Sequence, residues 1–107
     1  MQFQLSGQQI EVTPALREHA TGKLDRLLRL DDKLLSLAVV LTMDSGRQRA
    51  DGTLTATGTV FHASAMEADM YASLDVLFDK LAAQLRKYRD KVADKRQRET
   101  RQEREYG

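Results

Sequence analysis

The sequence predicts an α+β fold with the order β-α-β-β-β-α, in which two helices pack on one face of a four-stranded mixed sheet. Apolar residues recur at helical spacing near residues 14–28 and 69–92, and they alternate in the segments before and between these helices. The first helix must cross over between two strands, so those strands should be parallel with a right-handed connection. The later strands follow one another through short turns, which makes their pairings antiparallel.

The first strand is expected over residues 2–6, where Phe3 and Leu5 share one face. The first helix should begin at Thr13 and Pro14. Threonine is a good N-cap, and a proline at the first helical position loses no hydrogen bond.

This first helix should reach about residue 28. Its predicted core face consists of Leu16, Ala20, Leu24 and Leu27. A polar and basic flank lies beside that face and consists of His19, Lys23 and Arg26. Gly22 lies within the helix and should cost about 1 kcal/mol relative to alanine.

Three further strands are expected over residues 36–43, 53–57 and 59–66. Residues 44–52 are polar and contain glycine, so they are predicted to form a mobile connection. The last two strands should form a hairpin around Gly58. Small side chains on the core face of the last strand, which would let a helix lie close to the sheet, are Ala63 and Ala65.

The last helix should begin near residues 68–69 and is the most strongly patterned element. Its apolar stripe persists for five turns and consists of Leu74, Leu77, Phe78, Leu81, Leu85, Tyr88 and Val92. Beyond Ala93 this pattern ends. We therefore expect one domain over residues 1–93 and a charged tail over residues 94–107, which is either a helical extension or disordered.

The composition excludes several classes of function. The chain has 107 residues, which suits one domain, and it has no cysteine, which excludes disulfides, thiolate chemistry and cysteine-based zinc sites. The N-terminus has neither a basic leader nor an apolar segment of signal length, and no window is long enough to span a membrane. We expect a cytoplasmic protein without a membrane partner.

No enzymatic constellation is present. There is no glycine-rich phosphate loop, no nucleophile elbow and no metalloprotease motif. The two histidines, His19 and His62, have no carboxylates at metal-ligating spacing, and Asp75 and Asp79 are interpreted as a solvated helix face. We expect no catalysis, no cofactor, no metal and no small-molecule substrate.

Charge is unevenly distributed along the chain. The net charge is only +1, yet eight basic residues and two acidic residues lie between Lys80 and Arg98. Lysines form one stripe beside the core face of the last helix, at Lys80, Lys87 and Lys91, and aspartates lie on its opposite side. If the flank of the first helix faced the same groove, two basic flanks would bind a phosphate backbone mainly by counterion release. Chance clustering on a solvated helix is the alternative.

The sequence favours folded RNA as the polyanion. It has no recognition helix or zinc finger for the DNA major groove, and no strand carries paired exposed aromatic rings for unstacked bases. Two other hypotheses stay open at this point. One is a general module for double-stranded or structured RNA, and the other is a protein-interaction domain that uses its arginine- and glutamate-rich tail.

Short motifs over residues 1–92 give the sequence a family resemblance. In the first half they are Gly7 and residues 10–13, 15–18 and 23–24. In the second half they are residues 62–65, the Asp-Met-Tyr-Ala motif at 69–72, Asp75, and residues 79–81 and 84–88. These motifs resemble the bacterial ribosome hibernation promoting factors and ribosome-associated inhibitors.

The resemblance implies both a function and a set of contacts. It implies binding to the small ribosomal subunit and its 16S rRNA, in the cleft that holds mRNA and the A- and P-site tRNAs, and inhibition of translation in stationary phase or stress. The rRNA-binding residues that it implies are Lys23, Arg26, Lys80, Arg86, Lys87, Arg89 and Lys91. Arg17 is a weaker candidate.

Two departures from the family pattern stand out. Ala83 occupies a position that is often basic in the family, so one phosphate contact is expected to be missing. The chain also resembles the short form of the family, which lacks a C-terminal dimerisation domain. Pairing of ribosomes would then need a separate ribosome modulation factor.

Overall fold

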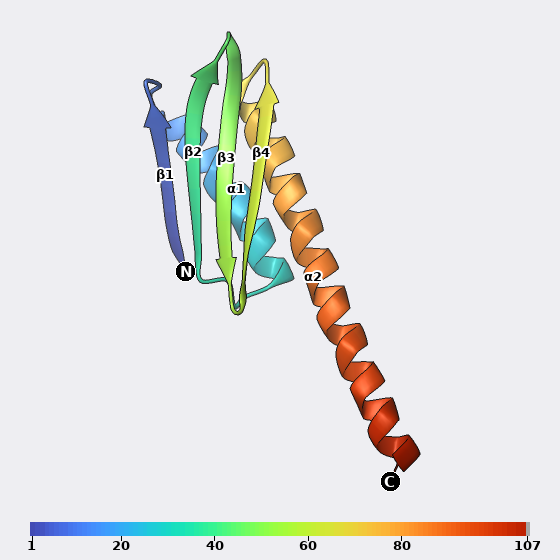
Figure 1. Ribbon diagram of the computed structural model, residues 1–107. Helices are drawn as coiled ribbons and strands as arrows, with labels where there is room; N and C mark the ends of the chain where they lie inside the picture. Colours follow the sequence, from blue (N-terminus) through green and yellow to red (C-terminus); the bar gives the residue numbers. More distant parts are fainter. Residues whose placement is uncertain (107) are drawn as a thin grey trace.

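The computed structural model has the predicted order of elements (Figure 1). It describes the backbone of residues 1–106 and the side chains of residues 1–92. The elements are β1 (Gln2–Gln8), α1 (Pro14–Leu30), β2 (Ser36–Asp44), β3 (Arg47–Ala56), β4 (Thr59–Glu67) and α2 (Met70–Tyr106).

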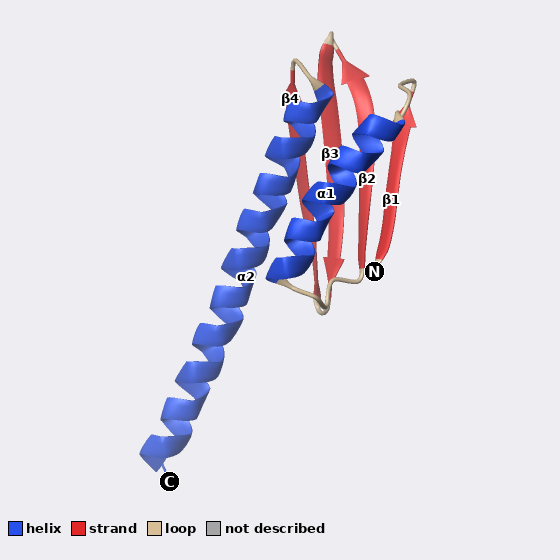
Figure 2. Cartoon of the chain, turned by 180° about the vertical axis from the view of Figure 1, so that it is seen from behind, coloured by secondary structure: helices blue, strands red, loops and turns tan. Residues whose placement is uncertain are grey.

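The four strands form one mixed sheet in the order β1-β2-β3-β4. Strand β1 is parallel to β2, and the β2–β3 and β3–β4 pairs are antiparallel. Both helices lie on the same face of the sheet, and neither covers its other face (Figure 2). The predicted fold class is therefore confirmed, including the parallel pair that the crossover helix requires.

Helix α1 forms as its sequence predicts. The Thr13 hydroxyl accepts a hydrogen bond of 3.2 Å from the Leu16 amide, and Pro14 is the first helical residue. The helix ends at Leu30, two residues beyond the expected end. The predicted core residues of this helix, Leu16, Ala20, Leu24 and Leu27, are all buried.

The predicted mobile connection over residues 44–52 is wrong. Only Ser45 and Gly46 link β2 to β3, and their φ angles of 51° and 80° suit the tight two-residue turn that matches the twist of a hairpin. Strand β3 therefore starts at Arg47. The residues at its core-facing positions, Ala50 and Gly52, are too small to give an apolar alternation. The sequence pattern therefore does not predict the first half of this strand.

Helix α2 packs closely on β3 because Gly52 has no side chain. A Cβ atom at Gly52 would lie 3.1 Å from Leu77 Cδ1 and 3.3 Å from Leu81 Cδ1. Gly52 pairs with Ala63 on β4, so two small residues form the floor beneath the helix. The close approach of the helix is shown at Gly52, a residue that the sequence pattern does not single out.

A buried serine fixes the N-terminal end of α2 along the sheet. Ser73 is fully buried, and its hydroxyl donates to the Gln48 carbonyl and accepts a hydrogen bond of 3.1 Å from the Glu67 amide. One side chain thus joins α2 to β3 and β4. Because a buried hydroxyl is costly without partners, this contact specifies the position of the helix.

The C-terminal part of α2 runs as a helix to Tyr106 and projects beyond the sheet (Figure 1). The side chains of residues 93–107 lie outside the described part of the chain. The division into a domain of 1–93 and a charged tail of 94–107 therefore stays a prediction.

Two glycine substitutions test this packing. Gly52→Val should lower the free energy of unfolding by about 2–3 kcal/mol, because the added side chain overpacks the contact with Leu77 and Leu81. Gly22→Ala should raise it by about 1 kcal/mol, because an added Cβ at Gly22 in α1 meets no side chain and no other element within 4 Å. Urea unfolding followed by circular dichroism measures both. Equal effects of the two substitutions would contradict the close approach of α2 to β3.

Candidate nucleic-acid interface

Most of the predicted basic residues are exposed. Six of the seven have exposed side chains, namely Arg26, Lys80, Arg86, Lys87, Arg89 and Lys91. Lys23 is mostly buried, with 20 % of its side chain accessible. Arg26 belongs to α1, and the five exposed basic residues of α2 lie on different sides of that helix.

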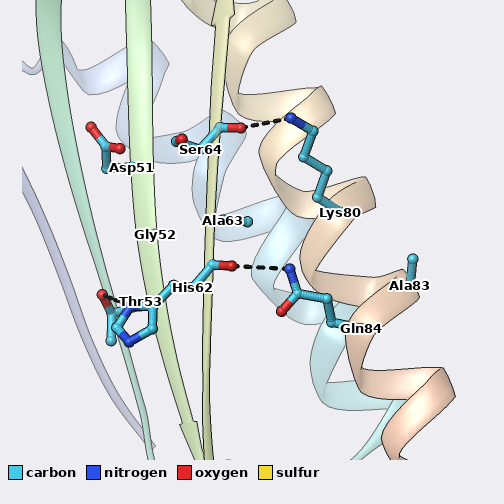
Figure 3. A pocket seen from close by; sticks show the side chains of 9 residues that line it. All are labelled: Asp51, Gly52, Thr53, His62, Ala63, Ser64, Lys80, Ala83 and Gln84. Atoms are coloured by element: carbon cyan, nitrogen blue, oxygen red, sulfur yellow. Dashed lines mark hydrogen bonds between the residues drawn. The ribbon is translucent and has the colours of Figure 1, made fainter.

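On the β4 side, two α2 side chains bond to the edge of the sheet (Figure 3). Lys80 Nζ donates to the Ser64 carbonyl at 2.7 Å, and Gln84 Nε2 donates to the His62 carbonyl at 3.0 Å. A groove follows this edge, and we call it the β4–α2 groove. It is bordered by His62, Ser64, Lys80, Ala83 and Gln84, and also by Asp51 of β3. The Asp51 carboxylate is paired with Arg49 at 3.0 Å.

The solvent side of α2 carries the remaining lysines of the predicted stripe. A second depression is lined by Ala83, Arg86, Lys87, Asp90 and Lys91. We call the surface formed by Arg86, Lys87 and Lys91 the outer basic surface. Ala83 borders both hollows, so the outer basic surface is continuous with the β4–α2 groove. The small side chain at position 83 leaves the passage between them open.

On the α1 side, the condition for a groove between the α1 flank and the lysine stripe is not met. His19 Nε2 lies 2.7 Å and Lys23 Nζ 3.2 Å from Asp75 Oδ1, so the α1 flank faces the aspartates of α2. Lys23 and Arg26 border a pocket with Asp79 and Arg86, so Arg86 is a basic residue of α2 that this flank does meet. The body of α2 separates this flank from the lysine stripe, which faces β4 and solvent.

Asp75 is therefore a structural ion-pair partner, and its interpretation as part of a solvated face is wrong. Burial disfavours its charged form, but the hydrogen bonds from His19 and Lys23 outweigh that effect and lower the pKa of the carboxyl. The His19 ring also meets Tyr71 edge to face, with centroids 5.2 Å apart. This cluster joins the two helices and neutralises Lys23.

Arg89 lies apart from the other predicted residues. It borders a hollow at the C-terminal end of α1, together with Arg29, Lys33 and Tyr88. The outer basic surface therefore depends mainly on Arg86, Lys87 and Lys91, with Lys80 at its β4 side.

The helical pattern places Gln84 next to the lysine stripe, but it does not indicate the contacts of Gln84 and Lys80 with the β4 edge. Gln84 and Lys80 bond to main-chain carbonyls, and such contacts leave no pattern in the side-chain types of a strand. The spacing of Lys80 and Gln84 on one flank of α2 is the only signal that the sequence offers.

Other kinds of site find no support in the described part of the chain. Within it, no three histidine, aspartate or glutamate side chains are grouped so that they could hold a metal ion. No helix there is long and apolar enough to cross a membrane.

Comparisons with known proteins place this geometry in a family context. A family model described as "Sigma 54 modulation protein / S30EA ribosomal protein" matches residues 3–93. The ribosome hibernation promoting factor of Escherichia coli K12 is 42 % identical over 92 residues, covering 86 % of this chain and 97 % of that protein. The factor of the same name from Azotobacter vinelandii is 39 % identical and covers 91 % of both chains.

Two solved structures share the fold. A ribosomal subunit interface protein from Coxiella burnetii superposes with a TM-score of 0.80 at 31 % identity, covering 84 % of this chain and 99 % of that one. The N-terminal domain of Thermus thermophilus Protein Y superposes with a TM-score of 0.74 at 32 % identity, covering 79 % and 94 % of the two chains.

The ion pairs of Asp75 predict a pH dependence of stability. A carboxyl with a lowered folded-state pKa stabilises the fold above its unfolded value, near 4, and this stabilisation is lost as the pH falls through the folded value. Asp75→Asn should therefore lower stability at pH 6 and make little difference near pH 2. Because 43 % of the Asp75 side chain is accessible, we expect less than about 1 kcal/mol.

Thermal unfolding from pH 2 to 7 checks this dependence. Asp79→Asn is the matched control, since Asp79 is exposed on the same helix and forms no ion pair with the described residues. An equal loss in both variants at pH 6 would contradict the role of the Asp75 cluster.

Proposed function

Since this chain belongs to the Sigma 54 modulation protein / S30EA ribosomal protein family, we propose that it is a ribosome hibernation factor. Relatives covered over nearly their whole length are named ribosome hibernation promoting factors. A role as a binding protein, not an enzyme, agrees with that family and with the absence of catalytic motifs from the sequence. A factor that acts on ribosomes works in the cytoplasm.

The observation that carries the proposal is the outer basic surface of α2. Arg86, Lys87 and Lys91 are exposed together on the solvent side of the helix, and Lys80 is held beside them at the β4 edge. Asp75 is already paired on the α1 side. Asp90 lines the same depression, so three basic side chains there face one acidic side chain. A surface of this kind attracts RNA phosphates and releases their counterions.

The finer proposal concerns the place of binding. We infer from the family resemblance that the target is the decoding region of the small subunit, where 16S rRNA surrounds mRNA and the A- and P-site tRNAs. Bound there, the protein excludes mRNA and tRNA sterically and silences ribosomes during stationary phase or stress. A separate ribosome modulation factor acting on the same ribosome is a further partner that the resemblance suggests.

A general module for structured RNA is the alternative, and it makes a different prediction. Such a module should bind naked RNA duplexes as tightly as it binds ribosomes. A hibernation factor should prefer the small subunit, because the cleft supplies a shape that a duplex lacks. The hypothesis of a protein-interacting tail concerns side chains outside the described residues and stays a prediction.

Charge reversal tests the outer basic surface. Lys87→Glu with Lys91→Glu should weaken co-sedimentation with small subunits by tenfold or more, on the order expected when two phosphate contacts become repulsive. Lys80 is left intact because its bond to Ser64 contributes to the fold.

The matched control reverses two exposed charges outside the candidate set, Lys33→Glu with Arg47→Glu. This variant has the same net charge and should co-sediment nearly as the wild type does. Equal losses in the two double variants would show that net charge decides binding, and would contradict an interface on α2. Retention by the Lys87 and Lys91 variant would contradict it as well.

A substitution at Ala83 tests the same surface by a predicted gain of binding. It is exposed between the two hollows, at a position that is often basic in the family. Ala83→Arg should tighten binding to small subunits and steepen its salt dependence by about one counterion, because it adds one phosphate contact. Ala83→Gln, which adds bulk without charge, is the control. An arginine variant that binds more weakly than the glutamine variant would contradict the placement of RNA along this side of α2.

A further inference from the structure

The edge of β4 has an unusual hydrogen-bonding state. The carbonyl groups of His62 and Ser64 accept hydrogen bonds from Gln84 and Lys80 of α2, so these carbonyls point away from β3. The pairs Thr53↔His62 and Asp51↔Ser64 are therefore the non-hydrogen-bonded pairs of the β3–β4 ladder. In such pairs the N–H of a residue points the same way as its carbonyl. The amides of His62 and Ser64 thus also face the β4–α2 groove.

The groove is consequently rich in donors that are still available. Lysine has three N–H groups, and one of those of Lys80 is used by Ser64. Gln84 uses one N–H on His62 and keeps a second N–H and its carbonyl oxygen. With the two strand amides, these groups form a row of donors at one end of the outer basic surface.

This arrangement discriminates between two kinds of partner. An added protein strand needs both the N–H and the C=O groups of the edge, and here the carbonyls are occupied by α2 side chains. An RNA backbone presents phosphate and ribose oxygens, which need donors only, and its 2′-hydroxyl can also donate to the Gln84 oxygen. Two carbonyls of this edge already accept bonds from α2, which disfavours an added strand there, whereas an oxygen-rich ligand needs only the donors.

We propose that the β4–α2 groove binds the sugar–phosphate backbone of RNA through uncharged donors, the Gln84 amide and the main-chain N–H groups of His62 and Ser64. This subsite rests on the proposed function and extends the outer basic surface past Ala83 to the sheet. Its contribution differs in kind from that of the lysines. A neutral hydrogen bond releases no counterion, so it adds affinity that salt does not remove.

The test compares salt dependences of binding to isolated small ribosomal subunits. Gln84→Met keeps the length of the side chain and removes its donors. It should weaken binding about three- to tenfold, the usual effect of one neutral hydrogen bond, equally at every salt concentration. Lys87→Met should instead reduce the slope of log affinity against log salt by about one. Gln4→Met, on an exposed glutamine of the opposite edge strand β1, should change neither quantity.

Three other results would overturn the proposed subsite, and they can be told apart. Unchanged affinity in Gln84→Met, with the wild type bound, would exclude the subsite and leave the proposed function standing. Tighter binding would indicate a protein strand, because the substitution frees the His62 carbonyl for a ladder bond. A wild type that does not bind small subunits would exclude the proposed function and the subsite together.

Hydrogen exchange provides a second measurement that needs no variant. The His62 and Ser64 amides should exchange rapidly in the free protein, because they face the groove without a ladder partner. They should become protected in the complex with small subunits, and peptides from β1 should not. Absence of protection in residues 59–67 would overturn the proposal even if Gln84→Met failed to fold.

Discussion

Helix α2 can lie against β3 because Gly52 leaves room for Leu77 and Leu81. The buried Ser73 then fixes the helix along its axis through its bonds to Gln48 and Glu67. Two constraints, one across the interface and one along it, thus determine the register of α2 against β4. Because of that register, Lys80 and Gln84, four residues apart on one flank, arrive opposite carbonyl groups two residues apart on the strand.

The same placement sorts the charges of α2 among its neighbours. The side toward α1 carries Asp75, which is satisfied by His19 and Lys23, so the positive charge of that flank is used within the fold. The solvent side keeps Arg86, Lys87 and Lys91, which form no ion pair among the described residues although Asp90 lines the same depression. A nearly neutral chain can therefore present a basic surface, because its packing pairs some charges and leaves others exposed.

Periodicity was sufficient for the fold, because long apolar stripes and alternating strands determine which faces are buried. It fails for the first half of β3, where Ala50 and Gly52 are buried but small, so the pattern predicts a connection over residues 44–52 and a strand only from residue 53. It also does not decide whether two basic flanks face one groove. A helical wheel orders residues around one axis but does not say how two helices are rotated toward each other. The bond of Gln84 to β4 could not be predicted for a third reason, since its partner is a main-chain carbonyl.

The small side chain at Ala83 links these features to the way the surface binds. With no charge there, the outer basic surface depends on fewer ionic contacts than the family pattern implies, and each ionic contact weakens as salt rises. The open passage that Ala83 leaves to the β4 edge gives access to donors whose strength does not depend on counterions. In this chain, affinity for RNA at physiological salt should therefore depend more on the uncharged groups of the edge than the count of basic residues suggests.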